Sequence, residues 1–327
     1  MSVVPYSVLD LVPVPEGGLP AESFRHSLDL ARHAERWGYH RYWLAEHHNM
    51  PGIASAATAV LIGHLAGGTT TLRLGAGGIM LPNHSPLVIA EQFGTLSSLY
   101  PARIDLGLGR APGSDQRTMQ ALRRQRSGEV DDFPADVREL MSYFGDEVGA
   151  VQAVPGQGLH VPIWLLGSSL FSAQLAAHMG LPYAFASHFA PRMLHQALDI
   201  YRRLFQPSAR LARPYAIVGV PVVAAPTDEE AQFLASSTYQ RVLGILTGQR
   251  GLLRPPVAGY MAQLQPHERA AITDFLAASV VGGPGTVRAG LQALADATQA
   301  DEFMLVSDVF DPQLRLRSLD ITAQAWT

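Results

Sequence analysis

Short apolar runs alternate along the chain with segments of helical periodicity, and this alternation constrains the fold more than any other feature. The expected strands cover residues 6–12, 39–45, 72–81, 103–109, 161–166, 182–186, 215–224 and 302–307. Between them stand helical patterns, such as the series Phe24, Leu28, Ala31 and Ala34 that ends before Gly38. Strands that alternate with helices form a parallel sheet buried on both sides. Eight such units favour an α/β fold of the closed (β/α)8, or TIM-barrel, type over an open doubly wound sheet.

The whole chain, residues 1–327, is expected to form a single barrel domain. A barrel of this kind reaches such a length when its loops carry insertions. Two stretches interrupt the alternation and are the expected insertions: residues 111–161 after the fourth strand and residues 226–283 after the seventh. The first is irregular apart from one helix near residues 137–144, whereas the second has a helical pattern throughout.

The composition excludes several classes of protein. The absence of cysteine rules out disulfides, thiolate nucleophiles, iron–sulfur clusters and thiolate zinc sites, and it fits the cytoplasmic location that we expect. The formal net charge is −4 and the sequence has no basic stripe, so nucleic-acid binding is not expected. Residues 1–5 lack a basic region followed by an apolar core, so a signal peptide is not expected, and apolar stretches such as residues 56–66 are too short to span a membrane.

Two adjacent histidines follow the second expected strand, in the segment Glu46-His47-His48. Barrel enzymes collect their chemistry at the carboxyl ends of the strands, and imidazole titrates near neutral pH. Because neighbouring residues on a strand point to opposite sides, at most one histidine is expected to face the barrel axis unless the strand has already bent. The other is then packed against the scaffold or hydrogen-bonded to it. A metal site would need further ligands; His84 and His188 could reach, but no His-x-His or Glu-x-x-His spacing supports such a site.

The ends of the fourth and fifth expected strands carry groups that suit a phosphate. Arg110 emerges directly after the fourth strand, and arginine binds phosphate well, although a surface ion pair is its commoner role. The turn Gly167-Ser168-Ser169 opens a helix, where free backbone N–H groups and the positive end of the helix dipole favour an anion. Ordinary capping of the helix by serine explains the same residues equally well.

Two glycine-rich segments allow a close approach of backbone. Residues 75–79 in the third expected strand would let a flat ring lie against bare backbone, but a strand kink or close helix packing would also require small residues. Residues 282–286 open the helix before the last strand, and Thr286 as a cap after a Pro-Gly turn explains them without a phosphate. This second segment is neither a P-loop nor a dinucleotide-binding fingerprint, because the lysine and the glycine spacing are absent.

In their order and spacing, four segments together resemble the bacterial luciferase-like flavin monooxygenase family. They are Tyr-Trp-Leu-Ala-Glu-His-His at 42–48, Leu-Gly-Ala-Gly-Gly-Ile-Met-Leu-Pro at 74–82, Ala-Glu-Gln-Phe at 90–93 and Arg-Ile-Asp-Leu-Gly-Leu-Gly-Arg at 103–110. The resemblance covers nearly the whole chain, and residues 7–14 are similar to the luciferase-family oxidoreductase subgroup. It implies FMN used as FMNH2, molecular oxygen, a separate NAD(P)H:flavin reductase and a homodimer.

The resemblance also implies roles for individual residues. His47 matches the active-site histidine near the flavin ring, a general base or a stabiliser of the flavin hydroperoxide, and His48 is its supporting neighbour. Gly77 and Gly78 match the pair whose backbone lies against the isoalloxazine, where the family often has a cis peptide bond. The matches to the phosphate-binding groups are Arg110 and the turn of Gly167, Ser168 and Ser169. Gly109 stands where luciferases carry a reactive cysteine, so light emission is not expected.

Three functions remain open on the sequence. The first is a two-component FMN monooxygenase that oxidises a small organic substrate, and the second is an F420-dependent oxidoreductase of the same fold that transfers hydride without oxygen. The triplet of Glu46, His47 and His48 favours the first over the second. The third is a flavin-binding protein without turnover. The sequence does not indicate the substrate, but residues 226–283 are expected to cover the barrel mouth and set specificity.

Overall fold

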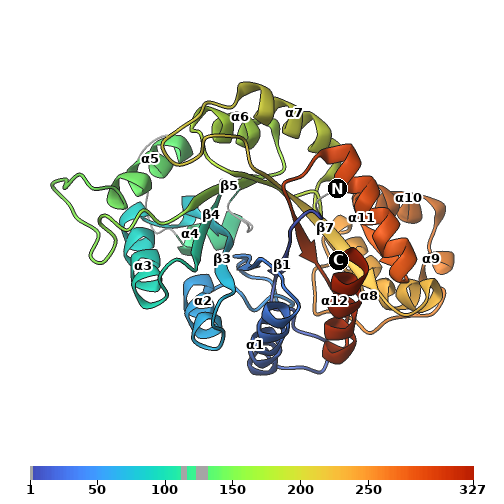
Figure 1. Cartoon of the computed structure of the whole chain (residues 1–327). Coiled ribbons are helices and arrows are strands. Elements are labelled where there is room, and N and C mark those ends of the chain that lie inside the picture. Colours follow the sequence, from blue (N-terminus) through green and yellow to red (C-terminus); the bar gives the residue numbers. More distant parts are fainter. Residues whose placement is uncertain (1–2, 112–115, 123–131) are drawn as a thin grey trace.

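The computed structural model describes residues 3–111, 116–122 and 132–327, and in it parallel strands close into a barrel (Figure 1). The barrel strands are β1 (Tyr6–Asp10), β2 (Arg41–Leu44), β3 (Arg73–Met80), β4 (Ile104–Gly109), β5 (Ile163–Gly167), β6 (Tyr183–Phe185), β7 (Ala216–Ala224) and β9 (Glu302–Val306). β6 pairs with β7, and β9 pairs with both β7 and β1, which closes the ring. The predicted (β/α)8 barrel is therefore confirmed.

Helices surround the ring of strands (Figure 1). They include α1 (Pro20–Arg36), α2 (Thr58–Gly67), α3 (Pro86–Leu99), α6 (Leu170–His178), α7 (Leu194–Leu204), α11 (Pro284–Thr298) and α12 (Pro312–Trp326). Several begin with proline, whose fixed φ suits the first helical position, where no intrahelical N–H bond is lost. Within the residues that the structure describes, the helices lack the length and apolar character that a bilayer crossing requires.

The two expected insertions differ in how well they were predicted. After β4 come α4 (Gln116–Leu122) and α5 (Phe133–Tyr143); α5 lies close to the predicted helix, and residues 112–115 and 123–131 fall outside the described part. After β7 come α8 (Asp228–Leu246), α9 (Tyr260–Gln263) and α10 (Pro266–Phe275), and then a strand, β8 (Val280–Gly282). The prediction of a wholly helical stretch was wrong here, because the end of β7 offers an edge with which these three residues pair.

Apolar side chains fill the inside of the barrel. Leu9, Trp43, Trp164, Ile217 and Met304 form one buried cluster, each from a different strand. The indole rings of Trp43 and Trp164 meet edge to face with their centroids 5.3 Å apart. Because the interior is packed, a ligand of the barrel has to bind at one of its ends.

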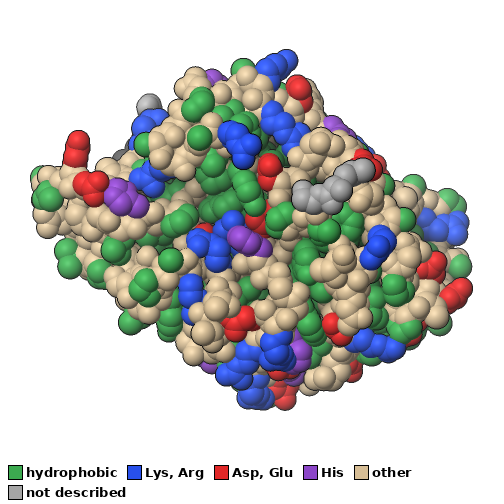
Figure 2. Space-filling view, viewed as in Figure 1, with side chains coloured by type: hydrophobic (Ala, Val, Ile, Leu, Met, Phe, Trp, Pro, Cys, Tyr) green, Lys and Arg blue, Asp and Glu red, His purple; other side chains and the backbone are tan. Residues whose placement is uncertain are grey.

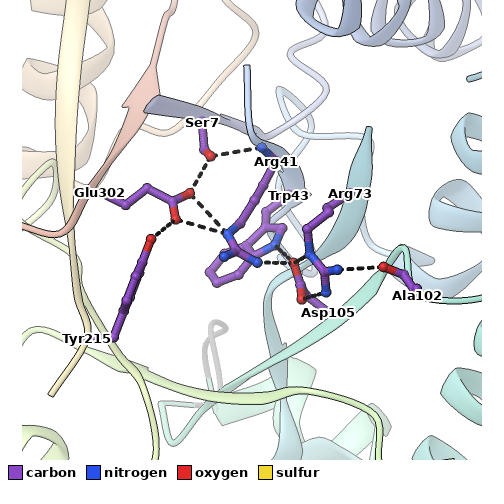
Figure 3. Close-up of polar contacts among 8 residues, drawn as sticks. All are labelled: Ser7, Arg41, Trp43, Arg73, Ala102, Asp105, Tyr215 and Glu302. Atoms are coloured by element: carbon purple, nitrogen blue, oxygen red, sulfur yellow. Dashed lines mark hydrogen bonds and ion pairs between the residues drawn. The ribbon is translucent and has the colours of Figure 1, made fainter. Parts of the chain in front are cut away.

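The amino-terminal end of the barrel is closed by buried charges. Figure 2, in the same view as Figure 1, shows basic, acidic and histidine side chains gathered near the middle of the visible face. Figure 3 shows how Arg41 lies between two carboxylates: its Nη1 is 2.7 Å from Oδ2 of Asp105, and its Nε is 3.1 Å from Oε2 of Glu302. Both carboxylates are fully buried. Arg73 also donates to Asp105, and the hydroxyl of Ser7 donates to Glu302.

The charges at the amino-terminal end of the barrel balance: two guanidinium groups, of Arg41 and Arg73, pair with the carboxylates of Asp105 and Glu302. Burial by itself would raise the pKa of Asp105, but the ion pair with Arg41 and the hydrogen bond from Arg73 outweigh it and hold the pKa below its ordinary value. Tyr215 donates a further hydrogen bond of 2.9 Å to Glu302. Asp105 is thus ionised, and both carboxylates are paired with a guanidinium group, as expected of a stabilising cluster at the end of the barrel that does not carry chemistry.

Candidate active site

A buried glutamate joins two histidines at the carboxyl-terminal mouth of the barrel. β2 ends at Leu44, and Glu46, which is only 1% exposed, lies just beyond it. Its Oε1 accepts hydrogen bonds from Nε2 of His48 at 2.7 Å and from Nε2 of His84 at 2.8 Å. Its Oε2 accepts from the backbone N–H of Met80 at 2.9 Å. One carboxylate therefore connects the ends of β2 and β3.

The ionisation state of Glu46 determines which ring nitrogen of His48 and of His84 carries a hydrogen. Burial tends to raise the pKa of Glu46, but the hydrogen bonds from His84, His48 and the backbone outweigh it, and the net shift is downward. An ionised carboxylate only accepts, so Nε2 of His48 and of His84 must each carry hydrogen. In the neutral rings, Nδ1 is then the proton acceptor. These three side chains, whose ligand atoms lie within 4.8 Å of one another, could also hold a metal ion, although the hydrogen bonds suffice to explain their arrangement.

His47 lies on the same loop but faces a different neighbour. It is partly buried and close enough to His188, which follows β6, to affect that residue electrostatically. The ring of His188 packs against Gly219 of β7, where a Cβ atom would lie 2.4 Å from the ring Nδ1. Burial, followed by the charges of Arg241 and His47, lowers the pKa of His188 to about 4, so this imidazole is neutral at physiological pH.

These positions bear on the orientation of the two adjacent histidines. Strand alternation predicts that at most one of them faces the barrel axis unless the strand has already bent, and β2 ends before either residue. His48 is held by Glu46, and His47 lies near His188, so both are at the mouth. Among their neighbours, Glu46 belongs to the sequence motif, but the sequence indicates no role for it. His84 and His188 are candidates from the sequence only as metal ligands.

Arg110 lies beside the first turn of α6. Gly109 at the end of β4 pairs with Leu166 of β5, so Arg110 emerges opposite the turn that leads into the helix. The centre of its guanidinium group stands 4.5 Å from the ring centroid of Phe171, the second residue of α6. A cation and a helix amino terminus thus flank one place on the surface of the mouth.

The turn after β5 leads directly into the first turn of α6. Ser169 is the N-cap of α6, and within the described residues its side chain does not cap the helix. Ordinary serine capping therefore does not account for this residue. Gly167 approaches the helix closely, because a Cβ atom there would lie 2.3 Å from Oγ of Ser172. Ser168 is partly buried and Ser169 is exposed.

The glycine pair of β3 lies beneath the mouth, and the peptide bond between Gly77 and Gly78 is cis. A Cβ atom at Gly77 would lie 2.7 Å from Cδ1 of Leu9 and 3.1 Å from Cβ of Trp43. At Gly78 it would lie 2.8 Å from the carbonyl oxygen of Gly107. Packing of the barrel interior already requires these glycines, so contact with a flat ring is an additional proposal for them.

The second glycine-rich turn is occupied by a side chain of the protein. Asp228 accepts a hydrogen bond of 2.6 Å from the N–H of Gly283 and one of 3.1 Å from the hydroxyl of Thr286. The interpretation that this turn does not bind phosphate agrees with this contact. The expected cap was wrong, however, because Gly283 is the N-cap of α11 and Thr286 bonds to Asp228 instead.

Asp10, at the end of β1, supports the mouth from below. Its carboxylate is fully buried and accepts from Nη2 of Arg315 at 2.9 Å, from the hydroxyls of Tyr42 and Ser27 at 2.5 Å each, and from the N–H of Val12 at 2.9 Å. Burial would raise the pKa of Asp10, yet these partners hold it below its ordinary value. Val12 has a φ of 52°, which is uncommon for a β-branched residue. Asp10 therefore fixes the turn that leaves β1.

A (β/α)8 barrel with titratable side chains gathered at the carboxyl ends of its strands is the architecture of an enzyme. The sequence model of the luciferase-like monooxygenase family matches residues 4–300, and the chain belongs to this family. A luciferase-like monooxygenase of Escherichia coli (strain K12) is 58% identical over 320 residues, covering 97% of this chain and 96% of that protein. The protein is thus a luciferase-like flavin-dependent monooxygenase, as the resemblance implied.

Solved structures show the same fold. Apo-MsnO8 is 37% identical, with a TM-score of 0.88 over 98% of both chains. Two more distant structures show the fold alone. One is the oxygenating constituent of 3,6-diketocamphane monooxygenase from Pseudomonas putida in complex with FMN, at 20% identity and a TM-score of 0.72 over 99% of this chain and 98% of that one. The other is an F420-dependent secondary alcohol dehydrogenase with an F420–acetone adduct, at 13% identity and a TM-score of 0.68 over 100% of both chains.

Proposed function

We propose that the protein is the oxygenase of a two-component system that takes FMNH2 from a separate NAD(P)H:flavin reductase and oxidises a small organic substrate with O2. The observation that carries this proposal is the position of Arg110, stacked on Phe171 beside the amino terminus of α6. A single phosphate that ends a flexible chain, as in FMN, fits between a guanidinium group and free backbone N–H groups. As in the family, the protein would act as a homodimer.

In this proposal, one group of residues at the mouth binds the cofactor and another transfers a proton. Arg110 and the turn of Gly167, Ser168 and Ser169 would hold the phosphate, and the backbone of Gly77 and Gly78 would lie against the ring. Reduced flavin, when bound there, supplies the electrons that activate oxygen. His47 would accept and return a proton at its imidazole during oxygen transfer.

His48 has a supporting role in this proposal. Its Nε2 is fixed on Glu46, as is that of His84, so the three side chains form a rigid polar wall beside the reaction site. The surrounding mouth would exclude water, which favours oxygen transfer over release of peroxide.

The F420-dependent alternative rests on the fold alone. The structure with an F420 adduct shares 13% of its residues with this chain, whereas the Escherichia coli luciferase-like monooxygenase shares 58% over nearly its full length. The closer similarity favours the monooxygenase. A binding comparison of the two cofactors distinguishes the two functions.

Replacement of Arg110 by alanine tests the phosphate site. The variant should bind FMN roughly ten- to hundredfold more weakly, because a charge-assisted contact contributes about 1.5–3 kcal/mol. Riboflavin, which lacks the phosphate, should bind the variant and the parent equally. The measurement is a fluorescence titration of both ligands, with Arg36→Ala as the control, since Arg36 is exposed at the end of α1. Equal losses of FMN and riboflavin would show that Arg110 is structural.

A further inference from the structure

Glu46 differs in its partners from four other buried carboxylates of the structure. Those four form ion pairs with arginine: Asp10 with Arg315, Asp105 and Glu302 with Arg41, and Asp308 with Arg241. Within the described residues, the partners of Glu46 are two imidazoles and a backbone N–H, and not a guanidinium group. Buried charges are generally paired with an opposite charge or coordinate a metal ion. The hydrogen bonds of Glu46 therefore explain its position but leave its negative charge to be balanced.

Three side chains with metal-binding atoms converge at this carboxylate. One ligand atom from each of Glu46, His48 and His84 lies within 4.8 Å of the other two. Nε2 of His48 is 2.7 Å, and Nε2 of His84 is 2.8 Å, from Oε1 of Glu46. In a tetrahedral zinc site, with bonds of about 2.0–2.2 Å, neighbouring ligand atoms are about 3.3 Å apart. Each nitrogen thus needs to move only about 0.5 Å from the oxygen to make room for a zinc ion.

The carboxylate is held from behind, and the imidazoles are open to solvent. Oε2 of Glu46 accepts from the N–H of Met80 at 2.9 Å, and the backbone N–H of Glu46 donates to the carbonyl of Gly78 at 3.2 Å. Hydrogen bonds of this kind orient a ligand and raise the affinity for a metal. The side chains of His48 and His84 are 16% and 27% exposed, which gives an ion a path to the three ligand atoms.

The donor set selects the ion. Two imidazole nitrogens and one carboxylate oxygen are the protein ligands of some zinc enzymes, with a water in the fourth position. Mg²⁺ and Ca²⁺ prefer oxygen ligands, and a given site binds Zn²⁺ more tightly than Fe²⁺ or Mn²⁺. We propose that Glu46, His48 and His84 bind Zn²⁺, which balances the buried charge and links the end of β2 to the turn after β3. This site does not depend on the proposed function, because the flavin takes no part in it.

Calorimetric titration with Zn²⁺ tests the proposal on the full-length protein, without a purification tag and after treatment with a chelator. The parent should bind one ion per chain. His84→Ala and Glu46→Gln should each weaken this binding by about 100-fold or more, because loss of a group that only supports a ligand already costs about 10–100-fold. Glu46→Gln keeps an oxygen for the N–H of Met80, and circular dichroism checks that both variants are folded.

His160→Ala is the matched control. Nε2 of His160 also contacts a carboxylate, Oδ1 of Asp146 at 2.9 Å, but this pair is exposed. Among the described residues, the pair belongs to no group of three metal-binding side chains. His160→Ala should therefore bind Zn²⁺ as tightly as the parent.

Two further measurements do not depend on heat of binding. Co²⁺ in place of Zn²⁺ should give the parent a visible absorption band that His84→Ala lacks. Zn²⁺ at about 100 times its Kd should raise the melting temperature of the parent by about 5 °C, because it binds only the folded chain. The same concentration of Zn²⁺ should not change the melting temperature of His84→Ala, and Mg²⁺ should not change that of the parent.

Three results would overturn the inference. They are no stoichiometric binding of Zn²⁺ by the parent, binding that is not weakened in either His84→Ala or Glu46→Gln, and tighter binding of Mg²⁺ than of Zn²⁺. The first result would mean that a protonated imidazole balances the charge of Glu46. A protein that binds Zn²⁺ through Glu46 but does not bind FMN would keep the metal site and refute the proposed flavin function, so the two failures are distinguishable.

Discussion

Replacement of His47 by alanine is expected to lower oxygen-transfer activity by roughly 100-fold or more, while the fold and FMN binding stay nearly intact. His47 lies beyond the end of β2 and near His188, whereas the residues proposed to bind the phosphate follow β4 and β5. The change should therefore remove a proton-transferring group without disturbing the groups that hold the cofactor.

The measurement is stopped-flow absorbance after FMNH2-loaded protein is mixed with oxygen. The delay before the absorbance of oxidised flavin returns should shorten by a similar factor in His47→Ala. His48→Ala is the control, and it should lose less activity and more stability, because it removes a hydrogen bond to the buried Glu46. If His47→Ala behaves like the parent while His48→Ala loses the delay, the two roles are reversed. If neither variant changes, the catalytic role of this motif is wrong.

Replacement of Arg41 by methionine should lower the free energy of unfolding by about 3–5 kcal/mol, the largest stability effect that we expect. Arg41 lies between Asp105 and Glu302, which are fully buried, and its loss would leave buried negative charge without its cation. Urea unfolding followed by circular dichroism measures the difference. Arg192→Met breaks the exposed ion pair with Asp274 and should hardly change the stability.

The effect of Arg41→Met should depend on pH. The pKa of Asp105 is lowered in the folded protein, so the stability that this group contributes is present above its unfolded pKa and is lost as the pH falls through the folded value. The difference between parent and variant should therefore be full at neutral pH and shrink in acid, below about pH 4. A small difference at neutral pH would show that the cluster does not stabilise the barrel.

The barrel could be predicted because its strands are apolar runs of a length that periodicity detects. β8 could not, since Val280–Gly282 is too short to show a period and pairs only because β7 extends past the ring. Strand alternation likewise could not orient His47 and His48, because β2 ends at Leu44. Both features lie where tertiary contacts, and not local pattern, decide the structure.

The sequence indicates individual residues of the candidate site but not the hydrogen bonds that join them. A strand-end motif indicates His47, His48 and Arg110, because parallel strands bring their carboxyl ends together. It does not indicate that Glu46 binds His84, which is 38 residues away.

The most direct test of the account is an anaerobic equilibrium titration of the parent protein with FMNH2, reduced FAD and reduced F420. The proposed site has anchors for one terminal phosphate on Arg110 and the turn before α6. FMNH2 should therefore bind more tightly than either of the other cofactors, and its advantage should disappear in Arg110→Ala. Tighter binding of F420 or FAD by the parent would contradict the proposal that the protein is an FMN-dependent monooxygenase.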